Sequence, residues 1–380
     1  MPRRPTVAAM FVALALAGPF PAQAQDMIDL RTVHADRRIT FRVEAPTARS
    51  VTVKPMSDNT GLLGGPFKMA RNGDGTWEVT TPPAESGFFY YELLIDGVAV
   101  ADPSCPPYFG WGKYTSGVDV PEPGVTFYKA NDVPHGDVRT RWYHSALTGR
   151  PRRAIVYTPP DYDAPDARDR RYPVLYLQHG AGENELGWTA QGRANFILDN
   201  AIAAARAVPM IVVMDNGYAA PAGAPAAEHR SPRGAGNLFD RVLLEELIPQ
   251  IDRGYRTLAD RDHRAIAGLS MGAGQALTIG LGHLDTFASI GAFSGGARAF
   301  DPATSYGGAF AGPADLNGRL RLLFLSNGHL DDRFAGSVEM HEALERTGVN
   351  HVWHATPGRH EWQAWRHHLH ALLPMLFTKQ

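Results

Sequence analysis

Apolar runs and helical stretches alternate along the second half of the chain. The runs that predict strands are 154–157, 173–178, 210–214, 264–268, 288–293, 321–325 and 351–355. The stretches that predict helices are 193–207, 237–251, 272–282, 336–347 and 365–377. Continuous apolar runs are typical of buried parallel strands, and their alternation with helices predicts a mostly parallel sheet covered on both faces. The second half is therefore predicted to be an α/β fold.

The first half has a different pattern, with short strands of period two. These runs are 39–43, 50–54, 76–80, 88–95 and 98–101. Asp96-Gly97 between the last two is a strong hairpin signal. Short strands separated by turns predict a β-sandwich over 25–118. The segment 119–133, with two prolines near its start, is predicted to be a stiff linker, which leaves 134–380 as the second domain.

An aromatic-rich segment, 103–114, closes the predicted sandwich. It contains Tyr108, Phe109, Trp111 and Tyr114. Exposed aromatic rings can stack on sugar rings, whereas a hydrophobic seam would pack against the second domain. The sequence favours the seam.

Residues 1–24 have the features of a secretory signal peptide. Arg3 and Arg4 precede the apolar run 7–17, which is too short to anchor the chain in a bilayer, and Ala22-Gln23-Ala24 fits a cleavage site. A secreted or periplasmic protein is expected, with no membrane insertion after cleavage. The lone cysteine, Cys105, has no partner within the chain, so we expect a small buried residue there.

Composition excludes several classes of function. The chain has 380 residues, enough for two domains, and its 37 basic and 39 acidic residues give a net charge of −2. Such a balance provides no broad attraction to nucleic acid or to an anionic membrane. The histidines of 367–370 lack nearby cysteine or aspartate partners. Neither a metal nor a cofactor is expected.

The most specific motif is Gly268-Leu269-Ser270-Met271-Gly272, which fits Gly-x-Ser-x-Gly. In this pattern a sharp strand-to-helix turn presents a nucleophilic serine, and close passage of the chain requires glycine on either side. A strand is predicted before the motif and a helix after it. Ser270 is therefore the candidate nucleophile.

A serine hydroxyl needs a base, and the base needs an orienting acid. Downstream of Ser270, His360 lies in a Pro-Gly loop after the last predicted strand, which makes it the candidate base. The candidate acid follows strand 321–325, where Asp331 and Asp332 stand side by side. Asp331 is favoured, and Asp332 remains the alternative. All three candidates follow strands, so they converge on one sheet edge.

The developing oxyanion would need two backbone N–H groups. One is predicted from Met271, directly after the nucleophile, and the other from Ala181 in the loop after strand 173–178. His179 lies in the same loop but precedes the serine, so it is interpreted as a residue that shapes the loop.

Residues 134–380 resemble the family 1 carbohydrate esterases, which include feruloyl and acetylxylan esterases and share a superfamily with siderophore esterases and mycolyltransferases. The matching segments are 156–162, 172–182, 210–217, 267–274, 293–296 and 358–369. The resemblance implies an α/β-hydrolase fold and favours Asp331, because relatives often have Gly-x-x-Asp and this chain has it at 328–331. It departs at Arg359, where relatives often have glycine. Residues 25–118 are similar to immunoglobulin-like modules related to family 48 carbohydrate-binding modules.

We therefore expect a secreted serine esterase acting on feruloyl or acetyl esters of xylan. A periplasmic siderophore esterase and an inactive carbohydrate-binding protein are the alternatives. Trp188 and Trp362 are candidates for stacking on substrate, or else core residues. The loop 358–362, which contains His360, has one basic residue, Arg359, and the loop 179–188 has no lysine or arginine. This favours a neutral ester over an anionic catecholate as the substrate.

Overall fold

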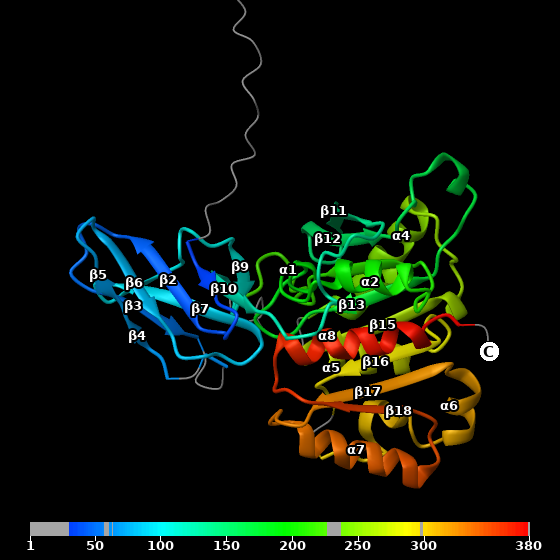
Figure 1. The fold of residues 1–380 in the computed structure, drawn as a ribbon. Coiled ribbons are helices and arrows are strands. Elements are labelled where there is room, and N and C mark those ends of the chain that lie inside the picture. The colour runs from blue at the N-terminus through cyan, green and yellow to red at the C-terminus, as the bar shows by residue number, and fades with distance from the viewer. Residues whose placement is uncertain (1–29, 57–60, 63, 226–236, 297–298, 379–380) are drawn as a thin grey trace, which may run out of the picture.

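The computed structural model describes residues 30–56, 61–62, 64–225, 237–296 and 299–378 (Figure 1). The predicted signal peptide, 1–24, lies outside the described residues.

An eight-stranded sheet forms the core of the second half, in the order β11-β12-β14-β13-β15-β16-β17-β18. Its strands are β11 (Asp137–Ser145), β12 (Arg150–Thr158), β13 (Val174–Gln178), β14 (Ile211–Asp215), β15 (Arg264–Leu269), β16 (Ser289–Phe293), β17 (Leu322–Gly328) and β18 (Val352–Thr356). The six strands from β14 to β18 are parallel, and β12 and β11 add antiparallel pairs at one edge. The predicted α/β-hydrolase fold is confirmed. β11 escaped prediction because most of it is exposed and few of its residues are apolar.

Helices cover both faces of this sheet (Figure 1). The helical segments are α1 (Gly187–Ala190), α2 (Ala194–Ala203), α3 (Phe239–Arg241), the π-helical turn η3 (Val242–Leu247), α4 (Ile248–Gly254), α5 (Met271–Gly282), α6 (Pro313–Arg319), α7 (Phe334–Thr347) and α8 (Trp362–Leu372). Short 3₁₀ turns lie at Pro165–Ala167, Arg261–His263, Ser305–Gly308 and Leu373–Met375. One hydrophobic core joins α5 and α7 to the sheet through Leu277 and Leu344. The other joins α2 and α8 through Leu198 and Leu369.

Two packed sheets form the first half, as the period-two pattern predicts. One has the order β1 (Thr32–Val33), β2 (Ile39–Glu44), β6 (Thr76–Thr80), β5 (Ala70–Arg71). The other has the order β4 (Phe67–Lys68), β3 (Val51–Pro55), β7 (Gly87–Ile95), β10 (Lys113–Val120), β9 (Tyr108–Gly110), with β8 (Val98–Val100) also paired to β7. Alternate residues face a common core, where Phe41 meets Tyr91 edge-on at 4.8 Å. The predicted β-sandwich and the β7–β8 hairpin at Asp96-Gly97 are confirmed.

The predicted sandwich boundary at 118 falls inside β10. Val118 and Val120 are buried and pair with β7, so the sheet continues two residues further. The segment that follows is packed rather than free. Tyr128 is buried, and the ring of Phe127 stacks on His370 of α8 at 4.1 Å. The stiff linker is predicted from the proline content of this segment. In the structure, packing against α8 holds the segment in place.

The sandwich and the α/β half share a hydrophobic core. The hydrophobic seam expected at 103–114 predicts this contact in part. Phe88 and Tyr90 of β7 pack among buried residues of α2 and α8, and half-buried Tyr108 lies against them. Trp111 and Tyr114, however, are 59% and 57% exposed. The seam therefore includes Tyr108 but leaves the tip of the β9–β10 hairpin uncovered.

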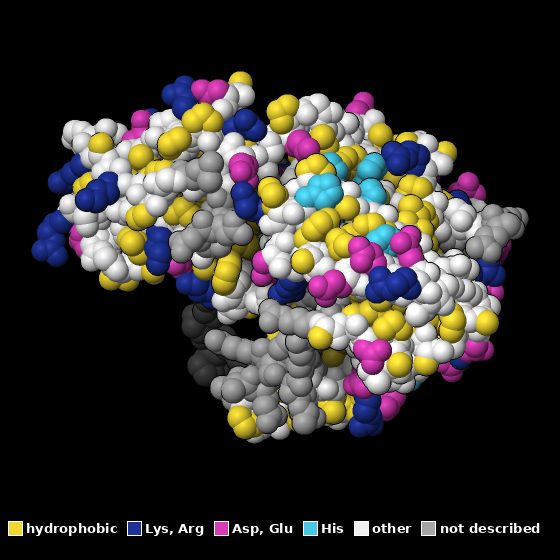
Figure 2. Space-filling view, turned by 90° about the horizontal axis from the view of Figure 1, so that it is seen from below, with side chains coloured by type: hydrophobic (Ala, Val, Ile, Leu, Met, Phe, Trp, Pro, Cys, Tyr) yellow, Lys and Arg dark blue, Asp and Glu magenta, His cyan; other side chains and the backbone are white. Residues whose placement is uncertain are grey.

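Charged side chains of both signs are interspersed over the face in Figure 2, in keeping with a net charge of −2. Among the described residues, no helix combines the length and apolar character needed to cross a membrane.

Candidate active site

Ser270 occupies a strained turn between β15 and α5. Its φ of 52° and ψ of −109° lie in a region that side-chain-bearing residues rarely adopt. The Ser270 N–H donates to the carbonyl of Phe293 on β16 at 2.8 Å, which holds the turn to the sheet. A Cβ on Gly272 would lie 2.6 Å from the carbonyl oxygen of His179, and a Cβ on Gly268 would lie 2.6 Å from that of Gly272. Only glycine fits at either position.

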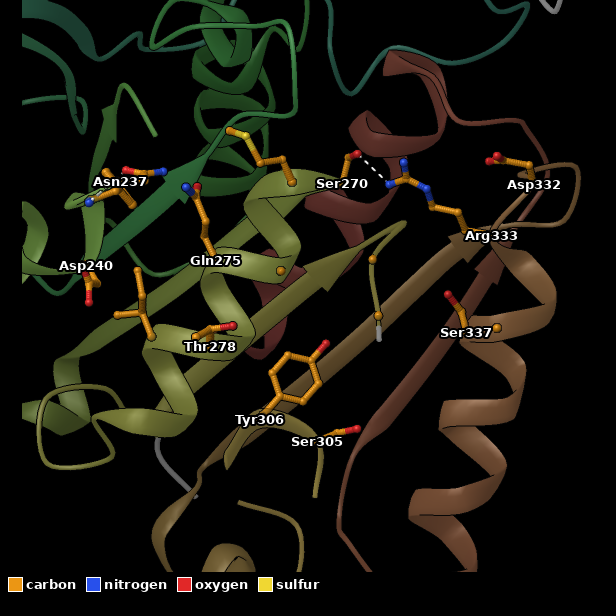
Figure 3. A pocket seen from close by; sticks show the side chains of 17 residues that line it. Asn237, Asp240, Ser270, Gln275, Thr278, Ser305, Tyr306, Asp332, Arg333 and Ser337 are labelled. Atoms are coloured by element: carbon orange, nitrogen blue, oxygen red, sulfur yellow. Dashed lines mark hydrogen bonds between the residues drawn. The ribbon is translucent and has the colours of Figure 1, made fainter. Parts of the chain in front are cut away.

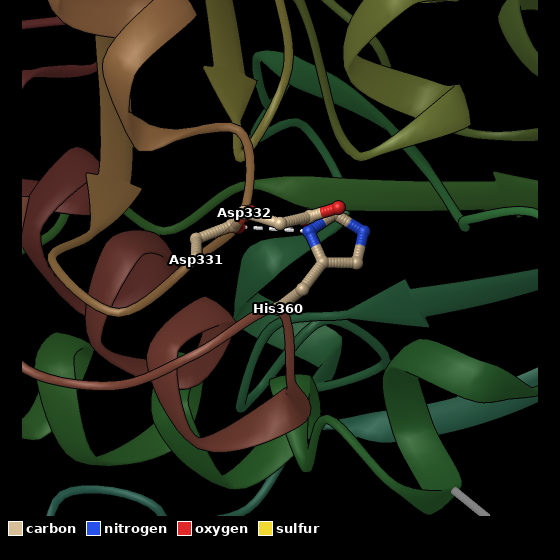
Figure 4. A group of neighbouring side chains, drawn as sticks. All are labelled: Asp331, Asp332 and His360. Carbon is tan, nitrogen blue, oxygen red and sulfur yellow. Dashed lines mark hydrogen bonds and ion pairs between the residues drawn. The ribbon is translucent and has the colours of Figure 1, made fainter. Parts of the chain in front are cut away.

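Three predicted side chains meet at the carboxyl ends of the strands. His360 Nε2 lies 2.9 Å from Ser270 Oγ, and His360 Nδ1 lies 2.8 Å from Asp331 Oδ2. Asp331 follows β17 and His360 follows β18, so two neighbouring parallel strands deliver them. Figure 4 shows the Asp331 carboxylate joined to the imidazole ring. Both ring nitrogens of His360 thus have a partner in the predicted set.

The environment of Asp331 favours its ionised form. Burial opposes ionisation, but the hydrogen bond and charge of His360 outweigh it and lower the pKa of the carboxyl to about 2. The backbone N–H of Arg333 also donates to Asp331 Oδ1 at 2.9 Å. Asp332 is exposed, although one of its carboxylate oxygens lies within 4.8 Å of an oxygen of Asp331 and a ring nitrogen of His360. Of the two aspartates, Asp331 makes the direct contact with His360.

The two loops predicted to supply N–H donors lie beside Ser270. A Cβ on Gly180, next to Ala181, would be 3.5 Å from Ser270 Cβ. Met271 begins α5, so its backbone N–H has no carbonyl partner within the helix. His179 is buried, and its Nδ1 lies 2.8 Å from the carbonyl oxygen of Gly180, while its Nε2 accepts from the Gly217 N–H at 3.0 Å. These two hydrogen bonds are with backbone atoms, in keeping with the loop-shaping interpretation.

A small cavity of about 260 Å³, here called the apolar pocket, opens on one side of Ser270. Its walls come from both halves of the chain and include several aromatic side chains, together with the charged residues Glu183, Glu361 and Arg333. The α/β half contributes His360 and Trp362, and the sandwich contributes Phe88, Tyr90 and Trp111. Flat apolar walls suit a flat apolar group.

A larger cavity of about 960 Å³, here called the open groove, also borders Ser270. Its lining is rich in hydroxyl, amide and carboxylate groups, as Figure 3 shows for Asn237, Asp240, Gln275, Thr278, Ser305, Tyr306 and Ser337. Such groups can hydrogen-bond to a polar ligand with many hydroxyls. Ser270 and Arg333 line both cavities.

Arg333 is the cation at the site, and sequence reasoning missed it. Its Nη1 donates to Ser270 Oγ at 2.8 Å, as Figure 3 shows. Arg359, the basic residue predicted beside the site, instead has its Nε 3.6 Å from Glu85 Oε2 of the sandwich. Arg359 thus faces a carboxylate of the sandwich, and its contact with substrate stays a prediction. The only available signal for Arg333 was its place two residues after Asp331.

The two candidate stacking tryptophans lie in the core. Trp188 is 1% exposed, and its indole N–H donates to the carbonyl of Gln178 at 2.9 Å. Trp362 is 2% exposed and packs edge-on against Trp188 at 5.4 Å, although one part of it reaches the wall of the apolar pocket. The burial of Trp188 excludes stacking of its ring on a substrate. Trp362 only forms part of the wall of the apolar pocket.

A buried carboxyl group lies at the junction of the two halves. The hydroxyl of Tyr90 donates to Glu183 Oε1 at 2.8 Å, and Gln191 Nε2 donates to Glu183 Oε2 at 3.1 Å and to the carbonyl of Phe109 at 2.9 Å. Burial raises the pKa of Glu183 to about 8, against the opposing effect of the Tyr90 hydrogen bond. Glu183 is therefore mostly protonated at neutral pH.

Glu183→Gln should stabilise the protein more at pH 8.5 than at pH 5. The folded-state pKa of about 8 lies above the ordinary value of 4.5, so the folded state holds the proton more tightly. Glu183 therefore makes its full contribution to the free energy of unfolding below pH 4.5. This stabilisation is lost as the pH rises through 8. Glutamine stays neutral throughout. The rise in the thermal unfolding midpoint caused by Glu183→Gln should be larger at pH 8.5 than at pH 5 by at least roughly 2 °C.

Glu339→Gln, at an exposed position on α7, is the control for this pH series. Its midpoint should follow that of the unsubstituted protein at both pH values. A Glu183→Gln gain of the same size at pH 5 and pH 8.5 would contradict the assigned protonation.

Comparison with known proteins agrees with this architecture. A family model described as "Putative esterase" matches residues 145–376, more than half of the chain. An endo-1,4-beta-xylanase/feruloyl esterase from Xylanibacter ruminicola is 40% identical over 273 residues, which are 70% of this chain and 36% of that protein. The chain thus spans about a third of the length of that relative.

Solved structures extend the likeness to the fold. A ferulic acid esterase, 26% identical, superposes with a TM-score of 0.53 over 64% of this chain and 98% of its own. The enterobactin esterase FES from Shigella flexneri, 18% identical, has a TM-score of 0.59 and covers 90% of this chain and 93% of its own, so this likeness reaches into the sandwich. Because the family model covers residues 145–376, more than half of the chain, the chain belongs to the esterase family that this model describes.

Proposed function

We propose that the protein is an exported serine esterase that hydrolyses feruloyl or acetyl esters on xylan-type polysaccharide. The observation that carries the proposal is the Ser270–His360–Asp331 chain of hydrogen bonds at the junction of the apolar pocket and the open groove. The xylanase/feruloyl esterase relative and the ferulic acid esterase neighbour support the substrate class.

In the proposed reaction Ser270 Oγ attacks the ester carbonyl while His360 Nε2 takes its proton. Asp331 holds the imidazole in the required tautomer and stabilises its protonated form. The N–H groups of Met271 and Ala181 bind the oxyanion. His360 then gives the proton to the departing sugar oxygen. Water, activated by His360, hydrolyses the acyl-enzyme and restores Ser270.

The two cavities divide the substrate between them. An acyl group fits the apolar pocket, and a sugar chain with its hydroxyl groups fits the open groove. Arg333 Nη1 donates to Ser270 Oγ, and this hydrogen bond has to break when Ser270 attacks. Export remains a prediction from residues 1–24.

A siderophore esterase is the second candidate, and Arg333 is the observation that favours it. A cation beside the nucleophile attracts an anionic catecholate more than a neutral ester. The likeness to the enterobactin esterase concerns the fold. An inactive carbohydrate-binding protein is disfavoured by the intact hydrogen bonds of His360.

A panel of esters assayed with one enzyme preparation separates these functions. The panel comprises methyl ferulate, acetylated xylan, p-nitrophenyl acetate and a ferric catecholate siderophore. We expect a higher kcat/KM on feruloylated or acetylated xylooligosaccharides than on the catecholate. A higher kcat/KM on the catecholate would replace the polysaccharide esterase with the siderophore esterase, and sugar binding without turnover of any ester would favour the binding protein.

A further inference from the structure

The hairpin between β9 and β10 reaches from the sandwich to the apolar pocket. β9 ends at Gly110 and β10 begins at Lys113, so Trp111 and Gly112 form a two-residue turn. Their φ angles are 56° and 76°. Two consecutive left-handed residues match a type I′ turn, which favours asparagine or aspartate before glycine. A tryptophan in this conformation is unusual and strained.

The α/β half holds this turn in place. The Gly112 N–H donates to the carbonyl of Gly182 at 2.8 Å. A Cβ on Gly182 would lie 3.1 Å from Trp111 Cα, so the two backbones touch. The hairpin therefore rests directly on the loop that carries Ala181, and Gln191 adds its hydrogen bond to Phe109. The backbone of Trp111 is positioned by the site loop itself.

The side chain of Trp111 is not used to build the core. It is 59% exposed, yet it lines the apolar pocket together with Ser270 and His360. A tryptophan normally stabilises a protein by burying its large ring. Here strain is retained at a position with little burial, which points to contact with a ligand.

We propose that Trp111 is the specificity-determining wall of the acyl site, so that the sandwich selects an aromatic acyl group. The inference rests on the proposed esterase function and names the acyl group that the function prefers. The indole offers a flat face to the ring of a hydroxycinnamoyl group. An acetyl group has no ring to stack, so its hydrolysis does not depend on Trp111.

Turnover of two esters tests this selection. Trp111→Ala should lower kcat/KM on methyl ferulate about tenfold, equivalent to ~1.4 kcal/mol, and leave kcat/KM on acetylated xylan, which has no aromatic ring, within about twofold. Trp111→Phe, which keeps a ring, should recover much of the loss. Tyr114→Ala is the matched control, because Tyr114 is an exposed aromatic residue of the same hairpin that packs on Phe109. It should leave both esters within about twofold.

Binding to a Ser270→Ala variant decides the inference without turnover. Calorimetric titration with methyl ferulate should give a Kd about tenfold higher when Trp111→Ala is added, and an unchanged Kd when Tyr114→Ala is added. An unchanged Kd with Trp111→Ala, or equal losses on both esters, overturns the inference, as does absence of binding to Ser270→Ala. If the unsubstituted protein hydrolyses neither ester, the proposed function fails, while the titration still decides whether Trp111 binds the aromatic group.

Discussion

Ser270→Ala should abolish ester hydrolysis while the fold is retained. Removing the hydroxyl leaves His360 without the group it activates, and loss of the nucleophile in a serine–histidine–aspartate set lowers kcat by roughly 10⁴–10⁶-fold. Initial rates on p-nitrophenyl acetate and methyl ferulate measure the loss, and circular dichroism with thermal unfolding checks the fold.

Ser50→Ala is a suitable control, because Ser50 lies on the surface of the sandwich, away from both cavities. Its rates should match those of the unsubstituted protein. Near-normal hydrolysis by Ser270→Ala would show that the proposed mechanism is wrong.

Asp331→Asn should lower turnover by roughly 10⁴-fold, and Asp332→Asn by less than about tenfold. An asparagine at 331 can hold His360 in the wrong tautomer, which is the origin of losses on this scale. The pKa of Asp331, at about 2, keeps the native carboxylate ionised at any ordinary assay pH. Asp332 is exposed and lies at the edge of the open groove. Parallel kcat measurements on one ester compare the two variants, and equal or reversed effects would assign the acid to Asp332.

Much of the geometry around Ser270 could be predicted because it depends on local rules. The glycines of the turn, the buried strands and the chain order serine–acid–histidine each have a short-range sequence signal. Parallel strands end at a common edge, so Asp331 and His360 could be placed beside Ser270 without knowing any long-range contact. The structure brings the three side chains into hydrogen-bonding distance.

Other parts could not be predicted because they depend on packing between distant segments. The sequence around Arg333 and Arg359 does not show which of the two side chains contacts Ser270. Only the path of each loop decides this contact. Trp188 follows a site loop in sequence, yet its ring points into the core. Trp111 precedes the site loop by about seventy positions, and only docking of the hairpin on Gly182 brings it to the pocket.

Arg366 restricts how this protein can be divided or recombined. Its guanidinium is completely buried on α8, where Nη1 and Nη2 lie 2.9 and 3.2 Å from the carboxylate of Asp119 and Nε donates to the carbonyl of Gln191. Truncating the chain between 120 and 134 would remove Asp119 and leave this guanidinium without its counter-ion. In a chimera with a different sandwich, residue 366 must therefore match the residue that takes the place of Asp119. The proline-containing stretch that looks like a natural cut site is the wrong place to separate the two halves.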